Sequence, residues 1–231
     1  QFIYENLSIA SNLIHSAYLC GIKNLIFLGS SCAYPRECKQ PMNEEYLLGG
    51  KLEPTNEGYS IAKISSIKLC EYYNKTKNCN FISIIPPNLY GPKDNFSDSN
   101  AHVISSLIRK FHKAKLRQDK IVNVWGTGKA RREFLFNLDL VDGIIFAMMH
   151  YNSSNYVNMG FGVDFTIKEL AILISKTVGF EGQIRWDKEK PDGMPLKLLD
   201  STLFFNMGWE PSVNLETGLS LTYQWYKESL K

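Results

Sequence analysis

Short apolar runs that alternate with helix-like segments constrain the fold of this sequence more than any other feature. The runs Asn24–Leu28 and Phe81–Ile85 are almost wholly apolar, and each is followed by turn residues, Gly29–Ser31 and Pro86–Pro87. A strand that is apolar on both sides must be covered on both faces of its sheet. Helices between the strands provide that cover in α/β proteins. The sequence therefore predicts an α/β fold with a Rossmann-like, doubly wound parallel sheet.

Helices are expected wherever apolar residues recur at helical spacing. The expected helices are 6–19, 59–74, 103–111, 138–149, 166–178 and 215–231, and further short strands are expected at 121–125 and 156–159. Thr166 and Glu169 have the spacing of a capping box. Asn214 is a suitable N-cap for the last helix. The helix boundaries at these two places are therefore predicted from local chemistry.

The composition excludes several classes of function. The chain has 231 residues, 44% of them hydrophobic, and 26 basic against 23 acidic residues leave a net charge of only +3. That balance predicts a folded domain with neither a nucleic-acid nor a membrane partner. Its 5 cysteines are an odd number without a CxxC pair, which indicates reduced thiols and a cytoplasmic location. We expect no metal site, because no His, Cys, Asp or Glu spacing suggests one.

A tyrosine and a lysine four residues apart, Tyr59 and Lys63, begin the expected helix 59–74. Residues at this spacing share a helix face, so the ammonium of Lys63 can lie beside the phenol of Tyr59. We expect the cation to lower the pKa of Tyr59 and to make the phenol a usable acid or base. The same spacing recurs at 73/77 and 223/227. Only Tyr59 begins its helix and follows a strand that ends in two serines.

The segment Leu28–Ser31 is the second candidate element. Ligands of open parallel sheets bind at the carboxyl ends of the strands, and this segment is such an end. Gly29 allows close approach of a backbone, and the hydroxyl of Ser30 can bond a carbonyl oxygen. An ordinary strand-ending turn with two satisfied serines explains the same residues equally well.

Several motifs together carry a family resemblance. The Gly-Ser-Ser strand end, the Tyr59/Lys63 pair and the segment 86–92 (PPNLYGP) resemble the extended short-chain dehydrogenase/reductase superfamily. Within it, the sequence resembles the GDP-L-fucose synthase family. The motifs that carry this closer resemblance are 30–35 (SSCAYP), 39–42 (KQPM), 52–57 (LEPTNE), 94–96 (DNF), 99–104 (SNAHVI), 132–135 (REFL) and 190–193 (KPDG).

This resemblance implies an activity: C3 and C5 epimerisation of GDP-4-keto-6-deoxy-D-mannose, then NADPH-dependent reduction at C4 to GDP-L-fucose. Tyr59 would protonate the C4 oxygen, Lys63 would hold the nicotinamide ribose, and Ser30 would bond the keto oxygen. Cys32 and His102 would be the acid–base pair for the epimerisations. A thiol and an imidazole both exchange protons near neutral pH. Because His102 precedes a helix, we expect the positive end of the helix dipole to favour its neutral form.

The resemblance also implies binding residues. The NADP(H) contacts would be Leu28, Gly29, Ser30, Ser31, Lys63, Pro86, Pro87, Asn88, Leu89 and His102. The GDP-sugar contacts would be Lys110, Trp125, Arg132, Asp192 and Lys197. Cations and an aromatic face suit a diphosphate with a guanine base. Without the resemblance, Cys32 would be a small buried hydrophobe, His102 a surface histidine and Trp125 a core residue.

The resemblance implies two domains. Residues 1–95 would form the C-terminal part of a dinucleotide-binding domain, and residues 96–231 mainly a smaller α/β substrate-binding lobe. Segments at about 121–160 would return to the first domain. The family's Gly-rich fingerprint does not occur before Asn24, so we expect a truncated, cleaved or partial polypeptide whose first sheet strands are missing. An apolar sheet edge and face beside Asn24–Leu28 would then be exposed.

Two alternatives remain open. The first is another nucleotide-sugar epimerase, dehydratase or reductase of the same superfamily. The second is a non-catalytic binding or regulatory fragment without the cofactor loop. The expected helices 6–19 and 59–74 carry apolar residues on more than one face, which exceeds what the cover of one sheet requires. From related enzymes we expect a homodimer in which these helices form a four-helix bundle.

Overall fold

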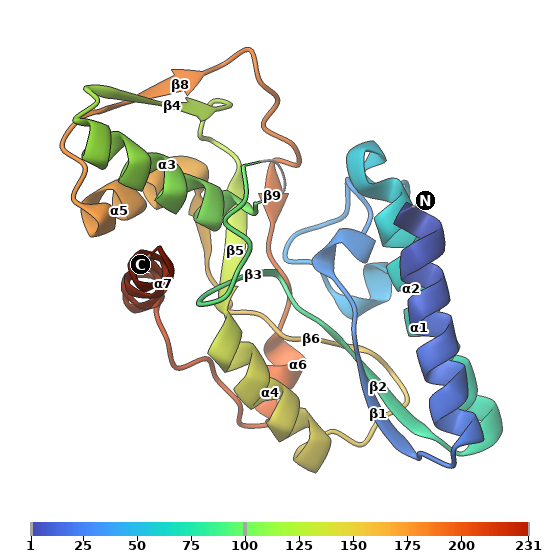
Figure 1. The fold of residues 1–231 in the computed structure, drawn as a ribbon. Helices are drawn as coiled ribbons and strands as arrows, with labels where there is room; N and C mark the ends of the chain where they lie inside the picture. Colours follow the sequence, from blue (N-terminus) through green and yellow to red (C-terminus); the bar gives the residue numbers. More distant parts are fainter. Residues whose placement is uncertain (1, 99–100, 231) are drawn as a thin grey trace. The chain divides into compact units, whose positions relative to one another are not determined.

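The computed structural model describes residues 2–98 and 101–230. The chain divides into two compact units, and it passes between them several times (Figure 1). Unit 1 comprises Gln1–Pro87, Leu140–Gly162 and Lys197–Glu210, and unit 2 comprises Asn88–Asp139, Val163–Leu196 and Pro211–Lys231. The domain functions expected from the sequence stay predictions.

A parallel sheet forms the centre of unit 1. Its strands are β1 (Asn24–Leu28), β2 (Asn80–Ile85) and β6 (Val157–Asn158), in the order β1-β2-β6. Leu25 pairs with Phe81, and Ile84 pairs with Val157. The expected α/β fold with a parallel sheet is confirmed.

Helices α1 (Phe2–Leu19) and α2 (Glu57–Lys77) lie side by side, and α2 packs against β1 and β2 (Figure 1). Ile14 of α1, Cys70 of α2 and Phe81 of β2 meet in one buried cluster, while Ile67 faces a second one. The remaining helices of unit 1 are α4 (Asn137–His150), which enters the unit at Leu140, and α6 (Thr202–Asn206). Short 3-10 turns lie at Ser31–Ala33, Glu44–Tyr46 and Pro54–Asn56.

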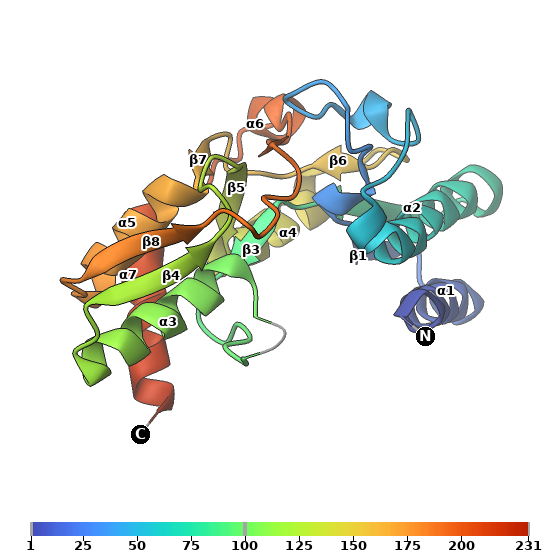
Figure 2. The same cartoon turned by 90° about the horizontal axis from the view of Figure 1, so that it is seen from above.

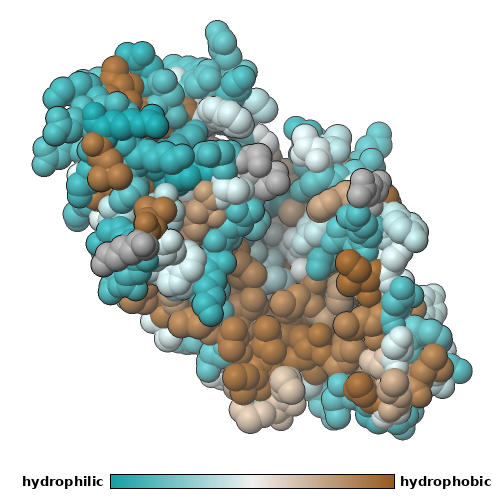
Figure 3. Space-filling model, viewed as in Figure 1, coloured by the Kyte–Doolittle hydropathy of each residue, from teal (hydrophilic) through white to brown (hydrophobic). Residues whose placement is uncertain are grey.

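Unit 1 leaves apolar side chains partly or fully exposed at two places on its surface. Strand β1 is the outer strand of the described sheet, and residues 25–28 are only half-buried. Helix α4 exposes Val141, Ile145, Met148 and Met149. Hydrophobic surface accordingly gathers over α4 and the neighbouring sheet face in Figure 3. The exposed apolar edge and face expected from the sequence are therefore present.

Unit 2 combines short strands with three longer helices. Its strands are β3 (Asn88–Tyr90), β4 (Ile121–Trp125), β5 (Arg131–Phe136), β7 (Asp164–Thr166), β8 (Gln183–Asp187) and β9 (Leu196–Lys197), the last of which ends at the boundary with unit 1. Strand β5 pairs in parallel with β3 and antiparallel with β7, while β4 pairs in parallel with β8. Figure 2 shows the β4–β8 pair beside α3 (Val103–Arg117) and α5 (Ile167–Val178). Helix α7 (Leu215–Ser229) packs against α5.

Local sequence signals locate the helix ends well and some strands poorly. Thr166 and Glu169 form the expected capping box, and the Asn214 side chain accepts a hydrogen bond from the backbone N–H of Thr217. Strands β3, β5, β7, β8 and β9 were not predicted. Strand β5 begins with Arg131, Arg132 and Glu133, and β3 and β9 are very short, so their partners rather than their own pattern make them strands.

Candidate active site

Main-chain hydrogen bonds join the ends of two strands in unit 1. The N–H of Gly29 donates to the carbonyl oxygen of Ile84 (2.7 Å), and that of Ser31 donates to Pro86 (3.1 Å). A Cβ atom on Gly29 would lie 3.1 Å from side-chain carbons of both Ile67 and Ile85, so a larger residue would push this pairing apart. The predicted residues 28–31 and 86–87 therefore form one joined edge.

Helix α2 places Tyr59 and Lys63 at this edge. The Nζ atom of Lys63 donates to the carbonyl oxygen of Leu28 (2.7 Å) and lies 5.6 Å from the centre of the Tyr59 ring. The Tyr59 ring also contacts Phe2 of α1, with the ring centres 5.9 Å apart. The structure therefore brings Leu28, Ser30, Tyr59 and Lys63 together, as the sequence predicts.

The expected pKa shift of Tyr59 is wrong in its direction. Burial raises the pKa of Tyr59, a hydrogen bond with Ser30 opposes this rise, and Cys32 adds to it. The ammonium of Lys63 bonds the Leu28 carbonyl, and burial lowers the pKa of Lys63 itself. Tyr59 is thus a protonated phenol at neutral pH, the form that a proton donor requires.

Cys32 contacts a lysine that is distant in sequence. Its Sγ atom lies 3.2 Å from Nζ of Lys197. The N–H of Cys32 donates to Oγ of Ser30 (3.2 Å), and its carbonyl oxygen accepts from the hydroxyl of Ser60 (2.8 Å). Cys32 therefore lies between a predicted catalytic residue, Ser30, and a predicted substrate contact, Lys197.

Many of the other predicted site residues line a pocket of about 310 Å³ in unit 2. The predicted residues in its lining are Asn88, Leu89, His102, Trp125, Arg132 and Asp192. The Asn88 side chain donates to the carbonyl oxygen of Glu133 (3.0 Å), which ties the pocket wall to β5. The predicted cofactor set is thus divided, with Asn88, Leu89 and His102 in unit 2 and the rest in unit 1.

His102 is the residue before α3, and a carboxylate lies beside its ring. Its Nδ1 atom lies 3.3 Å from Oδ1 of Asp94, and this hydrogen bond raises the pKa of His102 although partial burial opposes the rise. Asp94 also accepts hydrogen bonds from Ser105 and from the N–H of Asn95. The hydrogen bond to the Asp94 carboxylate therefore favours the charged imidazolium, which is opposite to the direction expected from the helix dipole. Ser99 and Asn100 of the predicted motif lie outside the described residues.

Trp125 ends β4 and forms an open aromatic surface that is 65% exposed. The Nζ atoms of Lys110 and Lys190 lie 5.4 and 5.8 Å from the centre of its ring. Trp125 is therefore not a core residue, and the two lysines give the pocket a positive side. Lys190 was not singled out from the sequence, although it lies in the quoted KPDG motif.

Asp192 closes a loop. Its two carboxylate oxygens accept from the backbone N–H (2.7 Å) and the hydroxyl (2.6 Å) of Thr127, and these bonds lower the pKa of Asp192. Gly126 has a φ of +83°, and a Cβ atom there would lie 2.2 Å from Asp192. Asp192 thus anchors the loop after Trp125, whether or not it also touches a ligand.

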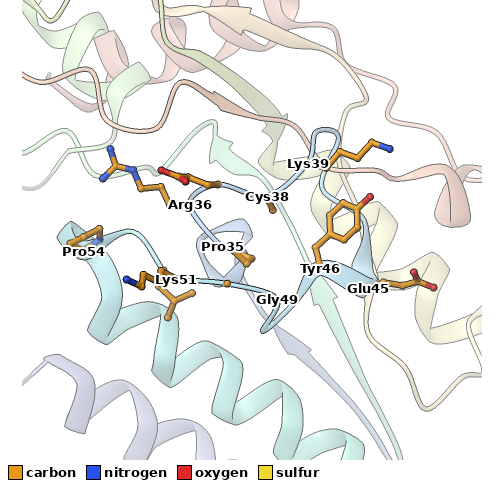
Figure 4. Close-up of a pocket in the computed structure, with 12 residues that line it drawn as sticks. Pro35, Arg36, Cys38, Lys39, Glu45, Tyr46, Gly49, Lys51 and Pro54 are labelled. Carbon is orange, nitrogen blue, oxygen red and sulfur yellow. The ribbon is translucent and has the colours of Figure 1, made fainter.

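A pocket of about 730 Å³, larger than the one in unit 2, lies in unit 1 and is lined by residues from the segment 35–54. Pro54, Arg36 and Lys51 lie on the left of the view in Figure 4, and Lys39 and Tyr46 lie on the right. None of the predicted site residues lines this pocket. Within residues 2–98 and 101–230, no group of three His, Cys, Asp or Glu side chains is arranged to hold a metal ion. In the same ranges, no helix has both the length and the apolar character needed to cross a membrane.

Comparisons with known proteins agree with the motifs. The chain is 48% identical over 238 residues to the GDP-L-fucose synthase of Escherichia coli, which covers 99% of this chain and 74% of that protein. A GDP-6-OMe-4-keto-L-xylo-heptose reductase from C. jejuni superposes with a TM-score of 0.94 at 36% identity, covering 99% of this chain and 77% of that one.

A second solved structure resembles the chain with a cofactor present. It is a GDP-L-fucose synthetase from Naegleria fowleri bound to NADP, with a TM-score of 0.92 at 29% identity, covering 97% of this chain and 72% of that one. The family model described as NAD dependent epimerase/dehydratase matches residues 1–160. The parallel sheet, the Tyr59/Lys63 pair at a strand end and these matches lead to one conclusion: the chain belongs to the NAD dependent epimerase/dehydratase family.

Proposed function

We propose that this chain converts GDP-4-keto-6-deoxy-D-mannose to GDP-L-fucose, by epimerisation at C3 and C5 and reduction at C4 with NADPH. The observation that carries the proposal is the group of Ser30, Cys32, Tyr59 and Lys63 around one strand end. A reductase alone requires the serine, the tyrosine and the lysine. The thiol beside them adds the proton exchange that an epimerase requires.

The residues at this edge fit a nicotinamide cofactor. The ammonium of Lys63 has three N–H donors, and Leu28 accepts one of them. The remaining donors suit the hydroxyl groups of a ribose. When bound, NADPH supplies the hydride that reduces C4. Ser30 would donate a hydrogen bond to the C4 oxygen, and Tyr59, whose raised pKa keeps its proton, would transfer that proton to the oxygen.

Cys32 and His102 would be the acid–base pair for the epimerisations. Protons next to the C4 ketone are acidic because the enolate charge is delocalised onto the C4 oxygen. The ammonium at Cys32 and the carboxylate at His102 place opposite charges beside the two groups. The GDP portion would bind in unit 2, where Arg132 and Lys110 suit a diphosphate and Trp125 suits a flat base.

Deuterium exchange tests this function. In D₂O, the chain incubated with the GDP-keto-sugar and NADPH should yield GDP-L-fucose labelled at C3 and C5. Cys32→Ser should lose both labels, whereas Cys20→Ser, which removes an exposed thiol, should behave as the parent. An unlabelled reduced sugar from the parent chain would exclude the epimerase activity.

A second candidate is C4 reduction of another GDP-sugar without epimerisation. It is favoured by the similarity to the GDP-heptose reductase, at a TM-score of 0.94. The two functions differ in their products, because a simple reductase transfers hydride without exchange at C3 or C5. The deuterium experiment therefore separates them.

We also propose a cytoplasmic homodimer. Ile9 and Leu13 of α1 and Ile61 and Tyr72 of α2 are exposed apolar side chains on neighbouring helices. A four-helix bundle of α1 and α2 with their copies would cover them. The cytoplasmic assignment rests on five free cysteines. Sedimentation equilibrium tests the dimer, and a monomer at micromolar concentration would contradict it.

A further inference from the structure

Lys197 is a buried lysine beside a thiol. Only 9% of Lys197 is exposed, and its Nζ atom lies 3.2 Å from Sγ of Cys32. No ion pair joins Lys197 to a carboxylate in the described part of the chain. A buried ammonium is costly unless a nearby group balances its charge. The closest group that can become an anion is the thiol of Cys32.

The position of Lys197 is set by the backbone around it. The N–H of Leu198 donates to Oε1 of Gln40 (3.0 Å), and the carbonyl oxygen of Leu198 accepts from the N–H of Met42 (2.7 Å). Leu199 and Met42 form a parallel bridge. The main chain directly after Lys197 is therefore held against the loop that follows Cys32.

Cys32 is held equally firmly. Its N–H and its carbonyl oxygen bond the side chains of Ser30 and Ser60. The main chains on both sides of this contact are therefore held in place, and the two side chains bring the nitrogen to 3.2 Å from the sulfur. Lys197 also acts on Cys38, where it lowers the pKa against the stronger rise caused by burial. Of these two thiols, only Cys32 is in direct contact with the ammonium in the described residues.

We propose that Lys197 is a positioning residue that stabilises the thiolate form of Cys32 and directs its sulfur, rather than a residue that primarily binds the sugar nucleotide. An adjacent ammonium favours a thiolate over a thiol by direct attraction. Together with the proposed function, on which this step rests, the thiolate removes a proton from the sugar carbon next to the ketone. An S–H bond forms, the C–H bond breaks, and its electron pair enters the enolate.

Alkylation of the complete 231-residue chain tests the charge effect without any sugar. Iodoacetamide reacts with thiolates, and mass spectrometry of peptides resolves the rate at each cysteine. Lys197→Met should slow alkylation of Cys32 about fivefold near pH 7, because a smaller fraction of the thiol is ionised. The effect is limited because each thiolate that does form without the lysine is more nucleophilic. Lys197→Arg keeps the charge and should stay within about twofold of the parent. The deficit should become smaller near pH 10, because a higher pH increases the thiolate fraction of the parent and the variant alike.

Two other cysteines and one lysine substitution serve as controls. Cys20 is exposed and provides a reference rate, whereas Cys70 is buried and should stay unreactive while the fold is intact. Lys23→Met removes one exposed positive charge elsewhere in unit 1 and should leave Cys32 unchanged. If Lys197→Met exposes Cys70, Lys197→Gln makes the same comparison with a polar side chain.

An unchanged Cys32 rate near pH 7 in a folded Lys197→Met chain would overturn the proposal, as would an equal deficit at both pH values, which indicates altered access. If Lys197 instead binds the substrate, the Lys197→Met chain should keep the parent alkylation rate at Cys32 and bind the GDP-sugar more weakly. A slowed Cys32 in a chain that never epimerises the sugar would support the role of Lys197 and refute the proposed function. The two failures are therefore distinguishable.

Discussion

The proposed catalytic residues of unit 1 and the pocket residues of unit 2 differ in how far their side chains are buried and paired with other groups of the protein. In unit 1, Lys63 bonds a main-chain carbonyl and Lys197 contacts the thiol of Cys32. In unit 2, Trp125 is 65% exposed and the His102 side chain is 73% exposed. The first group is already assembled, whereas the second remains open to solvent.

The difference follows from what each group has to do. Proton transfer requires donors and acceptors that are already aligned, because realignment during the reaction adds to the barrier. Recognition of a nucleotide requires surface that the ligand can cover, and exposed aromatic and cationic groups provide it. In this chain, buried polar groups accompany the proposed catalytic residues of unit 1, and an exposed aromatic ring accompanies the proposed binding surface of unit 2. His102 is the exception, because it is a proposed catalytic residue with an exposed side chain.

The largest effect is expected at Tyr59. Tyr59→Phe removes the proton donor and should slow NADPH oxidation with the keto-sugar at least about 100-fold. Proton exchange at C3 and C5 should continue, because it does not use the phenol. Tyr73→Phe changes the other tyrosine of α2 that precedes a lysine by four residues, and it should keep the parent rate. Normal reduction by Tyr59→Phe would end the assignment of Tyr59.

A smaller effect is expected at Arg132 in the open pocket. Arg132→Met removes a charge-assisted contact, which typically contributes about 1.5–3 kcal/mol, so GDP should bind about 10-fold or more weakly by calorimetry. Lys129→Met removes an exposed charge from the neighbouring loop and is the matched control. Equal GDP affinity in both variants would show that net charge rather than Arg132 attracts the diphosphate.

The start of α5 supports the wall of the open pocket, because Ile167 lines it directly after the capping residue Thr166. Thr166→Ala breaks the capping box and should lower the free energy of unfolding by about 1 kcal/mol in urea denaturation. Thr177→Ala lies in the same helix but bonds only the carbonyl of Leu173, so it should cost less. A larger loss at Thr177 would contradict this view of the helix start.

The smallest effect on stability is expected at Asp94. Asp94→Asn should lower the pKa of His102 toward its ordinary value, and NMR titration of the imidazole measures this shift directly. The ion pair contributes only about 0.5 kcal/mol, because the histidine is largely exposed.

The sign of the pH dependence follows from the two shifts. The hydrogen bonds of Asp94 outweigh its burial and lower its pKa, while the pKa of His102 is raised. The contribution of the pair is therefore lost as the pH rises through the raised value of His102 or falls through the lowered value of Asp94. Histidine titration that is identical in Asp94→Asn and the parent would show that another group sets the charge of His102.

Sequence alone determined the features that depend on neighbours along the chain. The run Asn24–Leu28 predicts a strand because nearly every side chain in it is apolar, and Thr166 predicts a helix start because its cap partner lies three residues away. The motifs around Tyr59 and Arg132 identified the family for the same reason. None of these inferences required a long-range contact.

Only the tertiary structure decided the charges at the site. The Tyr59/Lys63 spacing predicted a lowered tyrosine pKa, yet the burial of the Tyr59 phenol raises it. The helix start at His102 predicted a shift toward the neutral imidazole, yet the hydrogen bond to Asp94 raises the pKa of His102. Lys197 meets Cys32 across 165 positions of sequence. Electrostatic interactions depend on distance and burial, and the packing of distant segments sets both quantities.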